Sequence, residues 1–190
     1  DILVVNKIPM KEESLAQAEH LKLICLTATG TNNVDFAYVN QRGIAVTNVK
    51  GYSTQSVIQH TFALFFYLYE KLPYYDKFVK SGEYSRNDIF CHFDARFNEL
   101  YGKTWGIIGL GEIGRGVAAI AKLFGCRVIY YSTSGKNDNA DYERVDFDTL
   151  LKESDVVSIH APLNDATLNL IDKEALAKMK KSAILLNLGR

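Results

Sequence analysis

Cysteine is scarce in this sequence, and neither charge sign is in excess. The 190 residues contain three cysteines, Cys25, Cys91 and Cys126, whose spacing matches no zinc-ligand or redox pattern. So few cysteines are typical of a reducing compartment, and we expect a cytoplasmic protein. Lysine and arginine total 22, as do aspartate and glutamate, so the formal net charge is zero. This balance gives no electrostatic reason to expect nucleic acid or an anionic membrane as a partner.

Long apolar runs are missing as well. The most apolar stretch, 61–72, contains Glu70 and Lys71 and is too short to cross a bilayer, so we expect no membrane partner. Hydrophobic residues make up 47% of the chain and charged residues 23%, which excludes a disordered tail or a collagen-like fibre. The length suits one large globular domain or two small ones.

Short apolar runs alternate with helical patterns, as is typical of parallel β-sheets. The first series is expected to run strand 2–5, helix 11–20, strand 23–26, helix 34–42 and strand 44–47. The second is expected to run strand 104–108, helix 112–124, strand 127–131, a polar loop over 132–144, helix 146–152, strand 155–159, helix 173–180 and strand 183–187. The sequence therefore predicts an α/β protein with a small piece over 1–50 and a nucleotide-binding type of domain over 51–190.

A long helix is expected to connect the two series. It spans 54–72, ends at Pro73 and is apolar almost all round, so it should be buried on more than one side. The aromatic-rich stretch 77–101 that follows shows no clear period. Because an exposed apolar helix forms a patch typical of an interface, we expect a homodimer that buries this helix.

A glycine-rich loop is the clearest functional motif. Gly109-Leu110-Gly111-Glu112-Ile113-Gly114 fits GxGxxG, follows an expected strand and opens an expected helix. In such loops the first glycine (here Gly109) permits a tight turn, the second (Gly111) lets the backbone approach a pyrophosphate, and the third (Gly114) lets helix pack on strand. The helix N-terminus adds free N–H groups and a positive dipole. The motif predicts dinucleotide binding, with a structural glycine turn or a methyltransferase loop as alternatives.

The ribose of the dinucleotide usually meets an Asp or Glu at the end of the second strand. Ser132 stands at that position here, and Lys136 follows shortly after. One interpretation is tolerance of, or preference for, NADP, because a hydroxyl does not repel a 2′-phosphate and a lysine would attract it. The other is that Ser132 binds the ribose of NAD while Lys136 is solvated. Both interpretations stay open.

Four segments together resemble the D-isomer-specific 2-hydroxy acid dehydrogenases, particularly their glycerate dehydrogenase (hydroxypyruvate reductase) and phosphoglycerate dehydrogenase branches. The segments lie in the family's order and carry the sequences ATGTNNVD at 28–35, GKTWGIIGLGEIG at 102–114, SDVVSIHAPL at 154–163 and LNLGR at 186–190. The resemblance implies a Rossmann-type doubly wound parallel sheet over 51–190, preceded by a partial flavodoxin-like, substrate-binding domain over 1–50. It also implies a chain truncated at both ends.

The resemblance implies roles for single residues. The substrate carboxylate would be held by the backbone at Thr29 and Gly30 and by Arg190, whose planar fork suits a carboxylate. The family's catalytic histidine and its partner glutamate would lie beyond Arg190. Residues implied to line the cofactor are Thr29, Gly109, Gly111, Glu112, Ile113, Gly114, Ser132, Ala161, Pro162 and Leu188.

Two of these positions depart from the family pattern: Glu112 stands where arginine or another polar residue is common, and Ser132 replaces the usual acid. None of the four histidines stands at a sequence position that supports a role as the general base. His160 is the most tempting of them and is expected on the cofactor side.

The implied activity is hydride transfer between NAD or NADP and a small D-2-hydroxy or 2-oxo acid, with no metal. The alternative is a non-catalytic NAD(H)-sensing protein on the same fold, because fold does not fix function.

Overall fold

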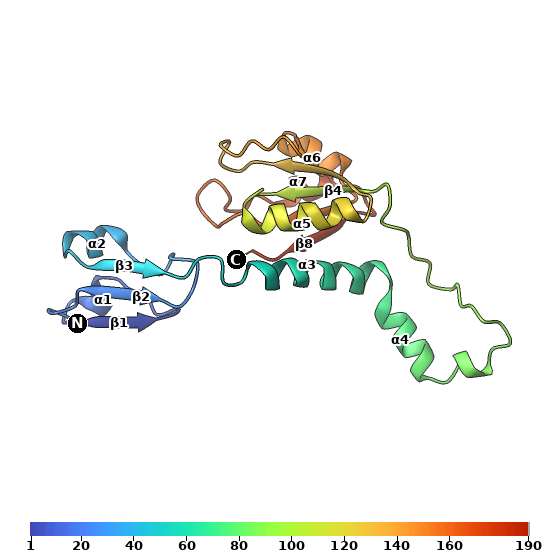
Figure 1. Cartoon of the computed structure of the whole chain (residues 1–190), viewed down its shortest axis with the longest axis horizontal. Helices are drawn as coiled ribbons and strands as arrows, with labels where there is room; N and C mark the ends of the chain where they lie inside the picture. The colour runs from blue at the N-terminus through green and yellow to red at the C-terminus, as the bar shows by residue number, and fades with distance from the viewer. Residues whose placement is uncertain (190) are drawn as a thin grey trace. The chain divides into compact units, whose positions relative to one another are not determined.

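A computed structural model describes residues 1–189, so Arg190 lies outside the described residues. The chain divides into two compact units, Asp1–Ser53 and Thr54–Arg190, which are described separately below (Figure 1). Within the described residues, no helix combines the length and the apolar character needed to cross a membrane.

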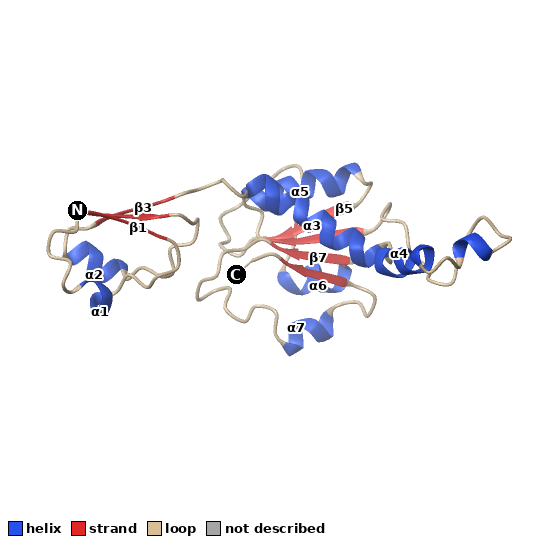
Figure 2. Ribbon diagram, turned by 90° about the horizontal axis from the view of Figure 1, so that it is seen from below, coloured by secondary structure: helices blue, strands red, loops and turns tan. Residues whose placement is uncertain are grey.

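The first unit is a three-stranded parallel sheet with helices on one face. Its elements are β1 (Ile2–Val5), α1 (Glu12–Leu15), β2 (Leu23–Leu26), α2 (Phe36–Gln41) and β3 (Ala45–Asn48), with the strand order β1-β2-β3. Figure 2 shows both helices on the same side of the strands. Ile24, Leu26 and Val39 are buried between sheet and helices, whereas Ile2 and Val4 on the other face are 62% and 67% exposed.

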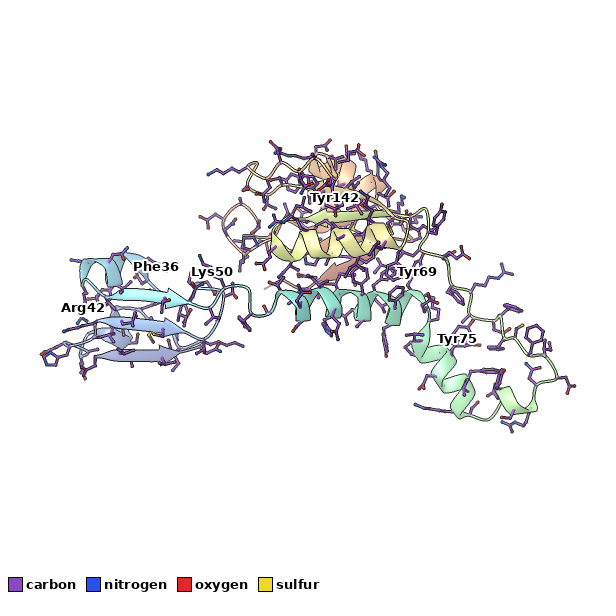
Figure 3. All side chains as sticks on the ribbon, in the orientation of Figure 1. Phe36, Arg42, Lys50, Tyr69, Tyr75 and Tyr142 are labelled. Atoms are coloured by element: carbon purple, nitrogen blue, oxygen red, sulfur yellow. The ribbon has the colours of Figure 1, made fainter. Side chains whose placement is uncertain are left out.

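The helices of this unit are shorter than the sequence predicts. The expected helix 11–20 is helical only at Glu12–Leu15, and the expected helix 34–42 only at Phe36–Gln41. Arg42 explains the first difference, because its guanidinium donates to the carbonyl oxygens of Leu15 at 2.7 Å and Ala18 at 2.9 Å (Figure 3). These bonds satisfy backbone acceptors that would otherwise need a longer helix or water.

The second unit is a five-stranded parallel sheet with helices on both faces. The strands are β4 (Thr104–Ile108), β5 (Arg127–Tyr131), β6 (Glu143–Arg144), β7 (Val156–Ile159) and β8 (Ile184–Asn187), in the order β6-β5-β4-β7-β8. The helices that pack on the sheet are α3 (Thr54–Tyr69), α5 (Glu112–Leu123), α6 (Phe147–Glu153) and α7 (Lys173–Lys178). Figure 2 shows α3 and α5 on one side of the strands and α6 and α7 on the other. This is the doubly wound Rossmann-type arrangement that the resemblance implied.

Trp105 of β4 is the centre of the core beneath α3. It is fully buried, and its ring lies 5.1 Å from that of Phe62 and 4.9 Å from that of Phe65, centroid to centroid. Its indole N–H donates to Ser158 Oγ of β7 at 2.9 Å, which satisfies a polar group inside the core. The opposite face of the sheet packs through Ile108 and Val157 against α6 and α7.

The prediction that Pro73 ends the long helix was wrong. Helix α3 ends at Tyr69, and Pro73 lies in the first turn of a further helix, α4 (Leu72–Lys80). Proline fits a first turn because its missing N–H needs no partner there. The break is at Lys71, whose φ of 55° is left-handed. A short 3₁₀ helix, η1 (Tyr84–Arg86), follows α4 inside the stretch that showed no period.

The two-residue strand β6 was also missed, because it lies inside the predicted polar loop. Glu143 and Arg144 are both exposed and show no apolar alternation. They join the sheet only by pairing with Ile129 and Tyr130 of β5. Position in the sheet, rather than local pattern, defines this strand.

Candidate functional site

The carboxyl ends of β4 and β7 meet at the point where the strand order reverses. From β4 the chain adds β5 and β6 on one side, then crosses back to add β7 and β8 on the other. Ligands of open parallel sheets bind at such a switch point, outside the carboxyl ends of the strands. The glycine loop follows β4 at this edge, and His160, Ala161 and Pro162 follow β7 beside it.

Two of the three motif glycines are required by the protein's own packing. Gly109 has a φ of 90°, and a Cβ at this residue would lie 2.9 Å from Cα of Ala161. A Cβ at Gly114 would lie 2.3 Å from the carbonyl oxygen of Gly109, so α5 approaches the end of β4 too closely for any side chain. These contacts lock the β4 loop, the β7 loop and the start of α5 together.

Gly111 differs from its neighbours in having open space above it. A Cβ at Gly111 would meet no atom within 4 Å, and its φ of −77° is ordinary for any residue. Gly111 is the N-cap of α5, where free backbone N–H groups and the helix dipole favour an anion. An anion that approached the N-terminus of α5 would therefore meet no protein atom close to the Cβ position of Gly111. Glu112, the first residue of α5, is exposed, and Ile113 is half-buried against the core.

His160 is a neutral imidazole at this edge. Burial lowers its pKa to about 4, and its Nε2 atom is buried with no hydrogen-bond partner among the described residues. Its backbone N–H donates to the carbonyl of Ile108 at 2.8 Å, which ties the end of β7 to β4. Next along the chain, Ala161 is half-buried and Pro162 is exposed, and the Pro162 carbonyl accepts from Thr167 Oγ1 at 2.6 Å.

The end of β8 contributes two hollows that the sequence did not reveal. Asn187 and Leu188 face the first half of α3, where Val57 and His60 help to enclose about 570 Å³. On the other side Asn187 and Ala161 border a hollow of about 260 Å³ beneath the loop 161–171. Thus α3, predicted as a buried helix and as part of a dimer interface, also lines the hollow beside Leu188. No local pattern signals this, because it depends on packing between segments more than a hundred residues apart.

The predicted ribose residue lies at the end of β5 but faces inward. Ser132 is 4% exposed, and its Oγ accepts from the backbone N–H of Asn137 at 3.4 Å. The strand end itself touches the glycine loop, because Gly109 N donates to the Tyr131 carbonyl at 3.0 Å. Lys136 is exposed in the turn between Ser132 and Asn137.

Two of the predicted substrate residues, Thr29 and Gly30, belong to the first unit. Thr29 and Gly30 follow β2 in the first unit and are exposed. The Thr29 hydroxyl donates to the carbonyl of Val49 at 2.9 Å, and the Thr29 carbonyl accepts from Asn48 Nδ2 at 2.7 Å, so this turn is held by its neighbour β3. The prediction for Arg190 falls outside the described residues. Across residues 1–189, no cluster of three or more His, Cys, Asp or Glu side chains is placed to hold a metal ion.

Comparison with known proteins identifies the family. The model of the D-isomer specific 2-hydroxyacid dehydrogenase, NAD binding domain, matches residues 62–190. A glycerate dehydrogenase of Methylorubrum extorquens is 37% identical over 190 residues, covering 100% of this chain and 59% of that protein. A glyoxylate reductase of Thermococcus litoralis is 40% identical over 192 residues, covering 99% of this chain and 57% of that protein. The chain thus spans about three-fifths of the length of these relatives.

Solved structures give the same result. An acyclic imino acid reductase (Bsp5) in complex with NADPH and D-Arg superposes with a TM-score of 0.89 at 31% identity, over 100% of this chain and 60% of that one. D-Lactate dehydrogenase from Aquifex aeolicus, complexed with NAD and lactic acid, superposes with a TM-score of 0.86 at 32% identity, over 98% and 55% respectively. From the doubly wound sheet, the glycine loop at its switch point and these matches, we conclude that the chain belongs to the D-isomer specific 2-hydroxyacid dehydrogenase family and contains its NAD binding domain.

Proposed function

We propose that the protein is an oxidoreductase that transfers hydride between NAD or NADP and a small D-2-hydroxy or 2-oxo acid. The observation that carries this proposal is the glycine loop at the switch point, with open space above Gly111 and locked packing at Gly109 and Gly114. Family membership supports the same reaction. Among the similar proteins are a glycerate dehydrogenase, a glyoxylate reductase and, from Blautia hydrogenotrophica, a hydroxypyruvate reductase. Glyoxylate and hydroxypyruvate are therefore the first substrates to test.

In this proposal the second unit holds the dinucleotide. The backbone N–H groups at Gly111 and at the start of α5 would bind the pyrophosphate, with Glu112 turned to solvent. Ala161, Pro162 and Leu188 would lie along the nicotinamide half, and the end of β5 along the adenosine half. The bound nicotinamide supplies the hydride chemistry. The neutral His160 would shape the wall of this site rather than exchange protons near neutral pH.

Two sets of residues would bind the acid. Thr29 and Gly30 offer the backbone of a turn braced by β3, and Arg190 offers a guanidinium that binds a carboxylate in two places. We assign the first unit, residues 1–53, to substrate binding, and residues 54–190 to the dinucleotide. Hydride transfer also needs a group that takes or gives the hydroxyl proton. By resemblance, a histidine paired with a glutamate would do this, and neither is assigned among residues 1–190.

Turnover of the full-length protein tests the activity directly. Oxidation of NADH or NADPH is followed by absorbance with glyoxylate or hydroxypyruvate as the acceptor. We expect turnover, and we expect Arg190→Ala to reduce it mainly by lowering the affinity for the substrate. A full-length protein that binds the dinucleotide but turns over neither these nor other 2-oxo acids would favour the alternative, a non-catalytic NAD(H)-sensing protein.

We further propose a homodimer formed through the outer side of α3 and the segment after it. Tyr67 and Leu68 on α3 are 53% and 49% exposed, and Phe90 and Phe93 are 88% and 74% exposed. The segment carrying the two phenylalanines is ordered against α4, because the Tyr75 hydroxyl donates to the carbonyl of Ala95 at 2.7 Å (Figure 3). Exposed apolar side chains gathered on one part of a surface are typical of an interface.

Light scattering of the full-length protein at micromolar concentration tests this assembly. We expect a dimer for the natural protein and a monomer for the double variant Tyr67→Glu with Leu68→Glu. Leu123→Glu is the matched control, because Leu123 is 86% exposed on α5 and lies outside the proposed interface. A monomeric natural protein would contradict the proposal.

The expected cytoplasmic location belongs with these proposals. It is supported by the free state of all three cysteines. Cys126 is buried, and burial raises the pKa of its thiol to about 11, so this thiol stays protonated and unreactive.

A further inference from the structure

The turn after β2 is tied to the end of β3 by three hydrogen bonds. The Val49 N–H donates to the carbonyl of Ala28 at 3.2 Å, and the Thr29 hydroxyl donates to the carbonyl of Val49 at 2.9 Å. The third bond comes from a side chain, because Asn48 Nδ2 donates to the carbonyl of Thr29 at 2.7 Å. Asn48 is the last residue of β3 and pairs in register with Leu26 of β2. The sheet therefore fixes the backbone from which this amide reaches the turn.

The bond from Asn48 sets the orientation of one peptide group. The carbonyl of Thr29 and the N–H of Gly30 belong to the same peptide, and no cis peptide bond occurs among residues 1–189. In a planar trans peptide the C=O and the N–H point in opposite directions. A carbonyl held toward Asn48 therefore directs the Gly30 N–H away from β3.

The Gly30 N–H is available to a ligand. No backbone carbonyl of residues 1–189 accepts a hydrogen bond from it, and Gly30 is exposed. The carbonyl of the same peptide already accepts a bond from Asn48, which polarises the group and makes its N–H a better donor. An exposed and oriented backbone N–H suits an anionic oxygen, such as that of a carboxylate.

The turn itself carries no charge that would repel a carboxylate. Residues 27–32 are Thr-Ala-Thr-Gly-Thr-Asn and contain no acidic side chain. The next carboxylate along the chain, Asp35, is the N-cap of α2, where its Oδ1 accepts from Tyr38 N at 3.1 Å. A carboxylate that approached the Gly30 N–H would therefore meet no acidic residue of the turn.

We propose that Asn48 is a positioning residue for substrate binding, because it orients the Gly30 N–H toward the carboxylate of the 2-hydroxy or 2-oxo acid. This inference rests on the proposed function, which assigns that carboxylate to the turn at Thr29 and Gly30. Asn48 itself would not touch the substrate. Without its amide the Thr29–Gly30 peptide could rotate, so the donor would be present but no longer held in the orientation that binding requires.

Asn6 offers a matched control at the same end of β2. Its Nδ2 donates to the carbonyl of Thr27 at 3.2 Å, so it is also an amide that braces the backbone directly after β2. The peptide of that carbonyl lies two residues before the Thr29–Gly30 peptide, and Asn6 therefore does not orient the Gly30 N–H. Asn6→Ala and Asn48→Ala each remove one such bond, and each should lower the stability of the full-length protein by a similar amount.

Steady-state kinetics of the full-length protein, with glyoxylate and saturating NADH or NADPH, tests the positioning role. We expect Asn48→Ala and Asn48→Leu to raise KM for glyoxylate about tenfold and to change kcat less than about twofold, because binding of the carboxylate is weakened. Oxamate, an unreactive analogue of a 2-oxo acid, should bind about tenfold more weakly to these variants saturated with NADH. The affinity for NADH, measured by its fluorescence, should stay unchanged. Asn6→Ala should leave all of these values unchanged.

The outcomes separate this inference from the proposed function. An unchanged KM in both Asn48 variants would overturn the positioning role. An equal rise of KM in Asn6→Ala, or a parallel loss of NADH affinity in the Asn48 variants, would also overturn it, because either result would indicate a general loss of structure. A natural protein that binds NADH but neither turns over glyoxylate nor binds oxamate would contradict the proposed function, and this inference with it.

Discussion

The two units of this chain build parallel sheets in different ways. In the second unit the central strands are buried along most of their length, because α3 and α5 cover one face and α6 and α7 the other. In the first unit β1 and β3 alternate between exposed and half-buried residues, because the described helices cover one face only. Parallel sheets are stable mainly when both faces are covered.

The difference shows why the candidate site belongs to the second unit. A sheet fixed from both faces leaves its carboxyl edge as the place where backbone N–H groups remain free, and the packing at Gly109 and Gly114 holds that edge rigid. In the first unit the turn at Thr29 is exposed, and Asn48 and the Val49 carbonyl brace it through single hydrogen bonds. We therefore propose the first unit for substrate binding and not for the dinucleotide.

The largest expected effect is on independent folding. We expect residues 54–190 to fold cooperatively as a separate fragment, with circular dichroism and dispersed NMR spectra typical of an α/β domain. Residues 1–53 should stay largely unfolded, because a domain of this size with one uncovered sheet face buries too little apolar surface. A well-dispersed NMR spectrum for the 1–53 fragment would contradict this contrast.

A smaller effect distinguishes two glycines of the same loop. Gly114→Ala should lower the free energy of unfolding of the second unit by about 3 kcal/mol, because its Cβ would overlap the Gly109 carbonyl oxygen. Gly111→Ala is the matched control, and its effect should stay below about 1 kcal/mol because its Cβ meets open space. Urea unfolding measures both, and equal losses for the two variants would show that the packing differs from that described here.

The smallest effect concerns pH and His160. Its folded pKa of about 4 is below the ordinary histidine value of 6.5, so the unfolded chain binds the proton first as the pH falls. Stability should therefore decline on acidification through this window, by about 2 kcal/mol between about pH 7.5 and about pH 5. His160→Gln should remove that part of the decline. If urea unfolding gives the same pH dependence for both proteins, the imidazole is not held neutral by burial.

The sequence was most informative where local pattern and packing agree. Four strands have the predicted bounds, because each is a short apolar run between turn residues. They are Ile2–Val5, Leu23–Leu26, Thr104–Ile108 and Arg127–Tyr131. The glycine loop was also predicted in its strand–turn–helix context. The GxGxxG spacing between a strand and a helix is a signal that the sequence shows directly.

Other features depend on contacts that the sequence does not show. The short α1 follows from bonds made by Arg42, and the start of α4 from the left-handed Lys71. The inward orientation of Ser132 follows from its bond to Asn137, and the hollow beside Leu188 from the packing of α3 on β8. Each depends on a specific tertiary contact or backbone conformation rather than on residue type or periodicity.

We expect the space above Gly111 to hold the pyrophosphate of a dinucleotide. The direct test compares NADH and NADPH binding to the full-length protein and to Gly111→Val, whose Cβ would enter that space with no other atom within 4 Å. We expect the fold to persist and the affinity for both dinucleotides to fall about tenfold to a hundredfold, because charge-assisted bonds from the backbone N–H groups are lost. Unchanged affinity in the folded variant would contradict the assignment of this edge as the dinucleotide site.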